Sequence, residues 1–148
     1  MNLSDHFSLW ELTKSQTAIR NGIDNTPDEE SIKNLKEVCT KILEPVRTHY
    51  DRPFTPSSGY RCWSLNRLLG SSDRSQHITG EAVDFEVPGI SNMDVARWMI
   101  NELDYDQLIL EFYKEPDPHS GWIHCSYVGI NNRNKAQRYD GRTWFSLS

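Results

Sequence analysis

Cysteine is scarce in this chain, which has only three: Cys39, Cys62 and Cys125. Their number is odd, their spacings are unrelated, and none of them lies in a CxxC pair. The sequence therefore predicts neither a disulfide framework nor a cysteine-rich structural zinc site. We expect small buried thiols in a protein that folds in a reducing compartment.

Long apolar runs and basic clusters are also missing. No stretch approaches the roughly 18 apolar residues that a membrane span needs, and residues 1–6 lack the basic region and apolar core of a secretory signal. The formal net charge is −5, whereas phosphate binding requires clustered lysine and arginine. The sequence therefore predicts no membrane segment, no signal peptide and no nucleic-acid partner.

Nothing in the chain indicates a domain boundary. Its 148 residues contain no internal repeat, low-complexity tract or Gly/Ser-rich linker, and such a length is typical of one domain. We therefore expect a single domain, residues 1–148, in which a hydrophobic content of 36% supplies a modest core.

Two helices are predicted from their N-terminal capping residues. Ser8, with Glu11 three residues later, forms a capping box at the start of a helix over residues 8–20. Ser91 is the expected cap of a second helix, over residues 91–103. Both segments therefore have a local signal that fixes where they begin.

A longer helix is predicted from residue 26 onward. Thr26 is the expected N-cap, Pro27 takes the first helical position, and Glu29 closes the capping box. Pro45 should kink or end this helix near that point. The apolar side chains that recur at helical spacing and should face a core are Ile32, Leu35, Val38, Cys39, Ile42, Leu43 and Val46.

Short strand-like segments complete the pattern. Residues 81–87 alternate in polarity, and residues 107–112 and 122–128 flank a proline-containing loop that indicates an antiparallel hairpin. Residues 129–148 should add a final strand or a cap over the edge of the core. The predicted fold class is α+β, with helices on one face of a small antiparallel sheet and the functional site on the other.

Three polar residues interrupt the apolar strands. His77, Asp84 and His124 are candidate ligands for one zinc ion, and Gly80 permits the turn from His77 into the strand that carries Asp84. Burying an unpaired carboxylate is expensive, so Asp84 needs either a salt bridge or a metal. Three protein ligands leave one coordination position open, which distinguishes catalytic from structural zinc. This pattern predicts a zinc-dependent hydrolase.

The motifs around these residues resemble a known family. The run SGYR at residues 58–61, the pattern SxHxxGxAxD at residues 75–84 and the segment WIHCS at residues 122–126 are similar to those of zinc D-Ala-D-Ala carboxypeptidases. That family includes phage L-alanyl-D-glutamate endopeptidases (endolysins) and D-Ala-D-Ala dipeptidases, and the hedgehog signalling domain looks like it in fold. The resemblance runs from about residue 7 to residue 127 and implies that the three candidate ligands bind Zn²⁺.

The same resemblance implies further site residues. It matches Arg61 to the arginine that binds substrate and polarises its carbonyl, a role that suits a guanidinium fork; without this context, Arg61 would be interpreted as an ordinary salt-bridged arginine. His119 matches a second catalytic histidine of the carboxypeptidase branch, with an exposed loop histidine as the alternative. Ser75, Gln76 and Trp122 are expected to contact the substrate together with Arg61.

One position departs from the family pattern. The endopeptidase and dipeptidase branches have a catalytic glutamate three residues before the last zinc ligand, where this chain has Gly121. The general base must then be either His119 or Glu111, a carboxylate in an apolar strand whose surroundings would raise its pKa. The alternative for Glu111 is an ion pair with a neighbouring arginine or lysine.

The resemblance also implies the substrate, which is the peptide stems or crosslinks of bacterial peptidoglycan. The expected protein is a monomeric carboxypeptidase or endopeptidase of the phage endolysin type. In the absence of a signal peptide, we expect it to be made in the cytoplasm and to act on the cell wall after release. Two other interpretations remain: a non-catalytic zinc-binding module of the same fold, and a virion-associated component for wall penetration.

Overall fold

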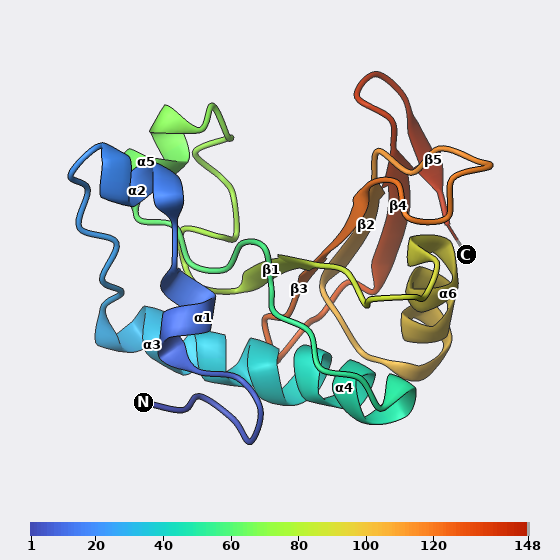
Figure 1. Ribbon diagram of the computed structural model, residues 1–148, viewed down its shortest axis with the longest axis horizontal. Helices are drawn as coiled ribbons and strands as arrows, with labels where there is room; N and C mark the ends of the chain where they lie inside the picture. The colour runs from blue at the N-terminus through green and yellow to red at the C-terminus, as the bar shows by residue number, and fades with distance from the viewer. Residues whose placement is uncertain (148) are drawn as a thin grey trace.

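A five-stranded sheet forms one layer of the protein, and helices cover one of its faces (Figure 1). The structure, a computed structural model, describes residues 1–147. In spatial order the strands are β1 (Ala82–Phe85), β3 (Trp122–Ser126), β2 (Gln107–Glu111), β4 (Lys135–Tyr139) and β5 (Trp144–Ser146). This arrangement confirms the predicted α+β class.

The sheet is mixed, however, and not wholly antiparallel as the sequence predicted. The predicted hairpin of β2 and β3 is present, and β1 with β3 and β4 with β5 are also antiparallel, but β4 runs parallel to β2. Both edges of β3 are already paired, with β1 and with β2. The chain that follows β3 therefore adds β4 to the free edge of β2. The tail thus supplies two strands, while Ser148 lies outside the described residues.

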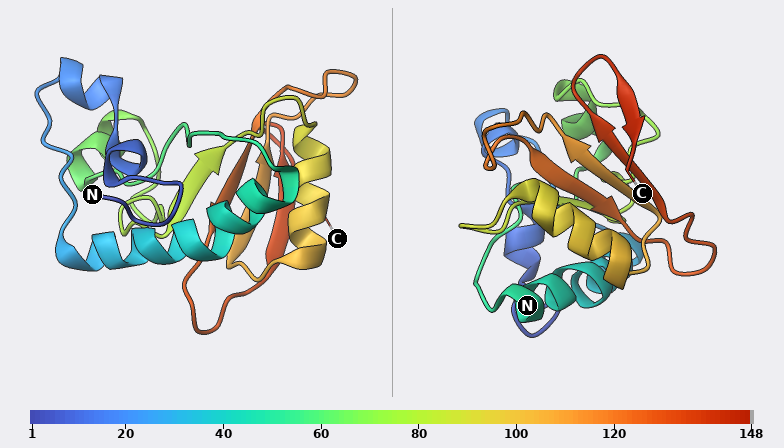
Figure 2. Two further views of the ribbon diagram at one scale, coloured as in Figure 1. Left: turned by 60° about the horizontal axis from the view of Figure 1, so that its bottom comes forward. Right: turned by 90° about the vertical axis from the view of Figure 1, so that its right-hand side faces the viewer.

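The helices lie mainly on one side of this sheet. A long helical stretch consists of α3 (Glu29–Val38), the π-helical turn η1 (Cys39–Leu43) and α4 (Glu44–Tyr50), and it runs across the sheet, with α6 (Asn92–Glu102) packed beside it (Figure 2). The short helices α1 (Leu9–Thr13), α2 (Gln16–Arg20) and α5 (Trp63–Leu68) gather near β1 at the other end of the molecule (Figure 1). Within residues 1–147, every helix is too short or too polar to cross a membrane.

Alternation along the strands separates a core face from a polar face. The side chains that are fully buried in the core include Val83, Phe85, Leu108, Leu110, Ile123 and Cys125 from the three central strands. Their chain neighbours Asp84, Ile109 and His124 point to the opposite face. A slip of one residue in register would exchange the two faces, so the packed core also fixes where the polar residues lie. Cys39 is buried like Cys125, whereas Cys62 is only half-buried.

The helix predicted over residues 8–20 is two helices. The predicted capping box is present, because the side chain of Ser8 accepts the Glu11 N–H and the Glu11 carboxylate accepts the Ser8 N–H. Lys14 and Ser15 then take extended backbone conformations, and the Ser15 side chain caps α2. The other capped helix, α6, follows Ser91 as predicted, although the Ser91 side chain makes no capping hydrogen bond.

The long helix begins and continues differently from the prediction. Its N-cap is Asp28 and not Thr26, because Asp28 Oδ1 accepts the Ser31 N–H at 2.8 Å, whereas Thr26 bonds to Asp24. Of the two outcomes expected at Pro45, a kink or an end, the end is not observed, because the helix continues to Tyr50. The π-helical turn immediately before Pro45 shifts the hydrogen-bond register, and this shift accommodates a residue that has no N–H.

A tight turn at Gly80 connects the loop before the sheet to β1. Gly80 has φ +77°, and a Cβ at this position would lie 2.6 Å from the backbone oxygen of Ser31 in α3. Its N–H donates to the carbonyl oxygen of His77, which closes the turn. The expectation that a glycine turns the chain between His77 and Asp84 is confirmed.

We predict that Gly80→Ala lowers the free energy of unfolding by more than Gly22→Ala does. Both positions have a positive φ, and strain there costs about 1–2 kcal/mol for a non-glycine residue. Only Gly80 also faces a backbone atom, since nothing lies within 4 Å of a Cβ at Gly22, and such overpacking adds about 1–3 kcal/mol. Chemical denaturation of both metal-free variants measures the difference, and equal losses would contradict this role of the turn.

Candidate metal centre

His77, Asp84 and His124 meet on the polar face of the sheet. Asp84 in β1 lies directly opposite His124 in β3, and His77 reaches them from the loop before β1. One ligand atom from each side chain lies within 4.8 Å of the others. The sequence therefore placed three separated residues correctly in one cluster, and this cluster is the candidate metal centre.

The spacing of the three side chains fits a zinc ion. Asp84 Oδ1 lies 2.9 Å from His124 Nδ1 and 3.4 Å from His77 Nε2. Ligands at about 2.0–2.1 Å in a tetrahedral site are separated by roughly 3.3 Å. Two imidazoles and one carboxylate are a donor set that zinc accepts, and they leave the remaining coordination position to water or substrate.

The backbone fixes the tautomer and orientation of His77. Its Nδ1 lies 2.7 Å from the carbonyl oxygen of Gly59, so Nδ1 carries the proton and donates, and Nε2 presents its lone pair to the centre. Gly59 itself is pressed against α1, since a Cβ there would lie 2.3 Å from the backbone oxygen of Leu12. The glycine of the SGYR motif is thus required for the close approach that holds a candidate ligand.

The electrostatics of the cluster favour the protonation states that metal binding needs. Burial would raise the pKa of Asp84, but the hydrogen bonds from His124 and His77 outweigh it and hold the Asp84 pKa well below its usual value. Burial lowers the pKa of His77. At neutral pH an ionised Asp84 and a neutral His77 are therefore ready to coordinate a cation.

Arg61 contacts the candidate ligand Asp84. Its side chain is 15% exposed, and its Nη2 lies 3.5 Å from Asp84 Oδ2. Nε donates to Ser58 Oγ at 3.1 Å, and Nη1 donates to Ser71 Oγ at 3.2 Å. These contacts use three of the five N–H groups of the guanidinium and leave two for another ligand. Arg61 is thus held beside the centre with donors to spare.

Glu111 lies on the same face of the sheet as the candidate ligands. It is paired with Trp122 across β2 and β3, as the sequence predicted, and its Oε2 accepts the indole N–H of Trp122 at 2.8 Å. Burial raises the pKa of Glu111, with the charge of Asp84 adding to the effect. Within residues 1–147 it forms no salt bridge, so the alternative of an ion pair does not explain this carboxylate.

His119 lies in the exposed loop between β2 and β3. Its backbone N–H donates to Asp117 Oδ1 at 3.0 Å, and its ring makes no hydrogen bond to any other residue of the described chain. Asn92 at the start of α6 anchors this loop, because its backbone N–H bonds to the Pro118 carbonyl and its side-chain amide bonds to Ser120 and Gly121. The structure thus does not bring His119 into the cluster of candidate ligands.

Gly121 stands at the position where the endopeptidase and dipeptidase branches have a glutamate. It has φ +68°, and a Cβ there would lie 2.0 Å from the carbonyl oxygen of Glu111. No side chain fits in this backbone arrangement. The polar face of the sheet does carry a carboxylate, at Glu111 in β2.

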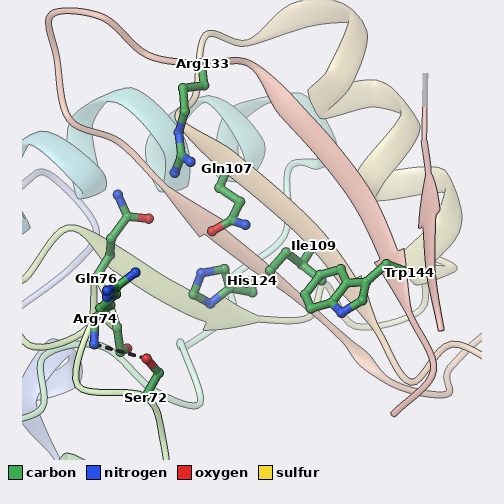
Figure 3. A pocket seen from close by; sticks show the side chains of 9 residues that line it. Ser72, Arg74, Gln76, Gln107, Ile109, His124, Arg133 and Trp144 are labelled. Atoms are coloured by element: carbon green, nitrogen blue, oxygen red, sulfur yellow. Dashed lines mark hydrogen bonds between the residues drawn. The ribbon is translucent and has the colours of Figure 1, made fainter. Parts of the chain in front are cut away.

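A groove of about 380 Å³ runs past His124 (Figure 3). Of the four expected substrate contacts, Ser75 and Gln76 line it, whereas Arg61 and Trp122 do not, and the Trp122 indole N–H is turned to Glu111. Six other residues of the lining had no predicted role in the site: Ser72, Arg74, Gln107, Ile109, Arg133 and Trp144. The sequence indicated this lining only through two arginines and one tryptophan, Arg74, Arg133 and Trp144, which lie outside the recognised motifs.

The chain matches the family model described as Peptidase M15 over residues 5–126. This stretch contains the three candidate ligands, Arg61 and Glu111. A search of the curated proteins finds no match. The family match covers most of the chain and bears out the resemblance to zinc D-Ala-D-Ala carboxypeptidases. The chain therefore belongs to the Peptidase M15 family, whose members are zinc-dependent metallopeptidases that hydrolyse peptide bonds.

Proposed function

We propose that this metallopeptidase cleaves amide bonds in the stem peptides or crosslinks of bacterial peptidoglycan, as a carboxypeptidase or endopeptidase of the phage endolysin type. The observation that carries the proposal is a candidate zinc ligand, His124, on the wall of a groove that can take a peptide. The groove is open enough for an extended chain, because it lies along the exposed face of β2 and β3 and not in a closed cavity.

In this proposal His77, Asp84 and His124 hold the zinc ion. When bound there, zinc polarises the scissile carbonyl and lowers the pKa of a water molecule. Asp84 supplies one negative charge, and the two neutral imidazoles add none, so the centre keeps a net positive charge. The Gly59 carbonyl keeps His77 in the tautomer that this role requires.

Glu111 is the general base that the geometry supports best. It is held by the Trp122 N–H on the same face as the candidate ligands, and its raised pKa lets it take a proton from the attacking water and pass it to the leaving amine. Arg61 uses its remaining N–H groups to hold a substrate carboxylate or the developing oxyanion. Ser75 and Gln76 contact the peptide from the wall of the groove.

A non-catalytic zinc module and a virion-associated component are the competing possibilities. A binding module has no chemical use for a half-buried glutamate on the face of its metal ligands, and burial of its charge is costly even with the hydrogen bond from Trp122. Glu111 is therefore the residue that favours an enzyme. A virion-associated component would share the same chemistry and differ only in where the protein is found, which proteomics of purified virions decides.

The first prediction of this proposal concerns the metal. Purified peptidoglycan incubated with the zinc-loaded protein should release peptide fragments that mass spectrometry identifies, and a chelator or His77→Ala should abolish both zinc binding and product. His49→Ala, a change on the helical side of the molecule where His49 stacks on Trp98, serves as the control and should keep both. Full cleavage by metal-free His77→Ala would overturn the proposal.

The second prediction separates the two candidate bases. If Glu111 is the base, Glu111→Gln should slow hydrolysis by at least about 10²-fold, whereas His119→Ala should have a small effect. Because Glu111 must be ionised to act, the wild-type rate should fall as the pH drops through its pKa, at a higher pH than an exposed glutamate would give. Wild-type rates in Glu111→Gln together with a large loss in His119→Ala would assign the base to His119.

The third prediction concerns Arg61. Arg61→Ala should retain zinc but lose activity by about 10- to 100-fold, the effect of one or two charge-assisted hydrogen bonds. Arg61→Lys should recover little of this loss, because an ammonium cannot reproduce the planar fork that binds Ser58, Ser71 and Asp84 together. Zinc content per protein and hydrolysis rate are measured on the same samples. Wild-type rates in Arg61→Ala would exclude the arginine from the reaction.

A further inference from the structure

The groove beside His124 has an uneven charge. Its lining includes two arginines, Arg74 and Arg133, and contains no aspartate or glutamate. The whole chain, in contrast, has 21 acidic and 16 basic residues and a net charge of −5. A surface of this sign in an acidic protein concentrates the opposite charge, and the local potential favours an anionic ligand.

Arg133 is held in place by a buried aspartate. Asp106 is 3% exposed, and its Oδ1 and Oδ2 accept Arg133 Nε at 3.0 Å and Nη2 at 2.8 Å. The same carboxylate accepts the Gln76 amide at 2.8 Å. The hydrogen bonds from Arg133 lower the pKa of Asp106 to about 2, so the Asp106 carboxylate stays ionised near neutral pH. Asp106 thus fixes Gln76 and Arg133 side by side on one wall.

Arg74 adds a charge that the protein does not balance. Among residues 1–147 it takes part in no salt bridge, and its backbone N–H bonds to Ser72 Oγ at 3.1 Å. Figure 3 shows Arg74 and Gln76 on one side of His124 and Trp144 on the other. Since the charge of Arg133 is offset by Asp106, Arg74 supplies the net positive charge of this wall.

The opposite side of His124 is apolar. Ile109 and Trp144 line it (Figure 3). The Trp144 ring is stacked on Tyr139 at a centroid distance of 4.3 Å, yet the residue is still 48% exposed. The groove thus has a cationic end, a candidate zinc ligand in the middle and an aromatic end. Such a difference between the two ends favours one orientation of a bound peptide over the other.

We propose that Arg74, with Gln76 and Arg133, forms a subsite for a carboxylate of the peptide substrate, and that the uncharged part of the substrate lies toward Trp144. A guanidinium and an amide are suitable donors for both oxygens of a carboxylate. This inference rests on the proposed function for the kind of peptide, because a peptidoglycan stem that contains glutamate can carry such a group. It makes Arg74 a residue that determines substrate specificity.

The test compares two synthetic stem peptides that differ only in a free glutamate carboxylate or its carboxamide. The zinc-loaded wild-type protein should prefer the acidic peptide, and Arg74→Gln should raise KM for it by about 10-fold with little change in kcat, because an open groove retains only part of a charge-assisted hydrogen bond. The KM for the carboxamide should stay the same. Arg74→Lys should recover part of the preference, since it keeps the charge without the fork.

Arg67→Gln is the matched control, because Arg67 lies over the ring of Trp63 in α5 and does not line the groove. It should leave both KM values unchanged. Calorimetric binding of the same two peptides to the zinc-loaded Glu111→Gln protein, with and without Arg74→Gln, provides a readout that needs no hydrolysis. An Arg74-dependent preference in binding with no cleavage by the wild type would refute the proposed function and keep the subsite.

The inference is overturned if the wild type binds and cleaves the two peptides equally, or if Arg74→Gln weakens both to the same extent. In the latter case Arg74 contacts a part of the substrate that the two peptides share. Cleavage that proceeds without any preference would leave the proposed function standing and remove the carboxylate subsite, so the two failures can be told apart.

Discussion

The pairing of Asp84 with His124 across β1 and β3 is the contact on which the rest of the site depends. A carboxylate that is 7% exposed needs partners, and the two imidazoles and Arg61 provide them on three sides. The strand register that brings Asp84 opposite His124 is the one that buries Val83 and Ile123 in the core. Stability and chemistry are therefore fixed by a single alignment of two strands, and neither can shift without the other.

The parts of the fold that could be predicted are those with a local signal. The capping box at Ser8 and Glu11, the hairpin of β2 and β3, and the turn at Gly80 each depend on residues close in sequence. The candidate ligands could also be predicted, since polar residues in apolar strands and a ten-residue motif mark them. The choice of Thr26 over Asp28 as N-cap was wrong because both residue types cap helices, and only the packed position of α3 decides between them.

The parts that could not be predicted depend on contacts between distant segments. No local sequence pattern predicts that β4 pairs parallel to β2, because the pairing partner of β4 depends on which edge of the sheet the chain reaches after β3. The groove has the same origin: Gln76 and Arg133 come together only because the buried Asp106 binds both of them. The general base is an intermediate case. The sequence left His119 and Glu111 open, and the backbone around Gly121 explains why the usual position of a glutamate is closed.

The two strands contributed by the tail have a further consequence. The family match ends at residue 126, yet Arg133 and Trp144 beyond it stand at opposite ends of the groove. The lining of the groove is thus divided between the two stretches, because Arg74, Gln76 and Gln107 lie within the matched residues and only Arg133 and Trp144 follow them. A different tail would therefore change the two residues at the ends of the groove and leave His77, Asp84 and His124 in place.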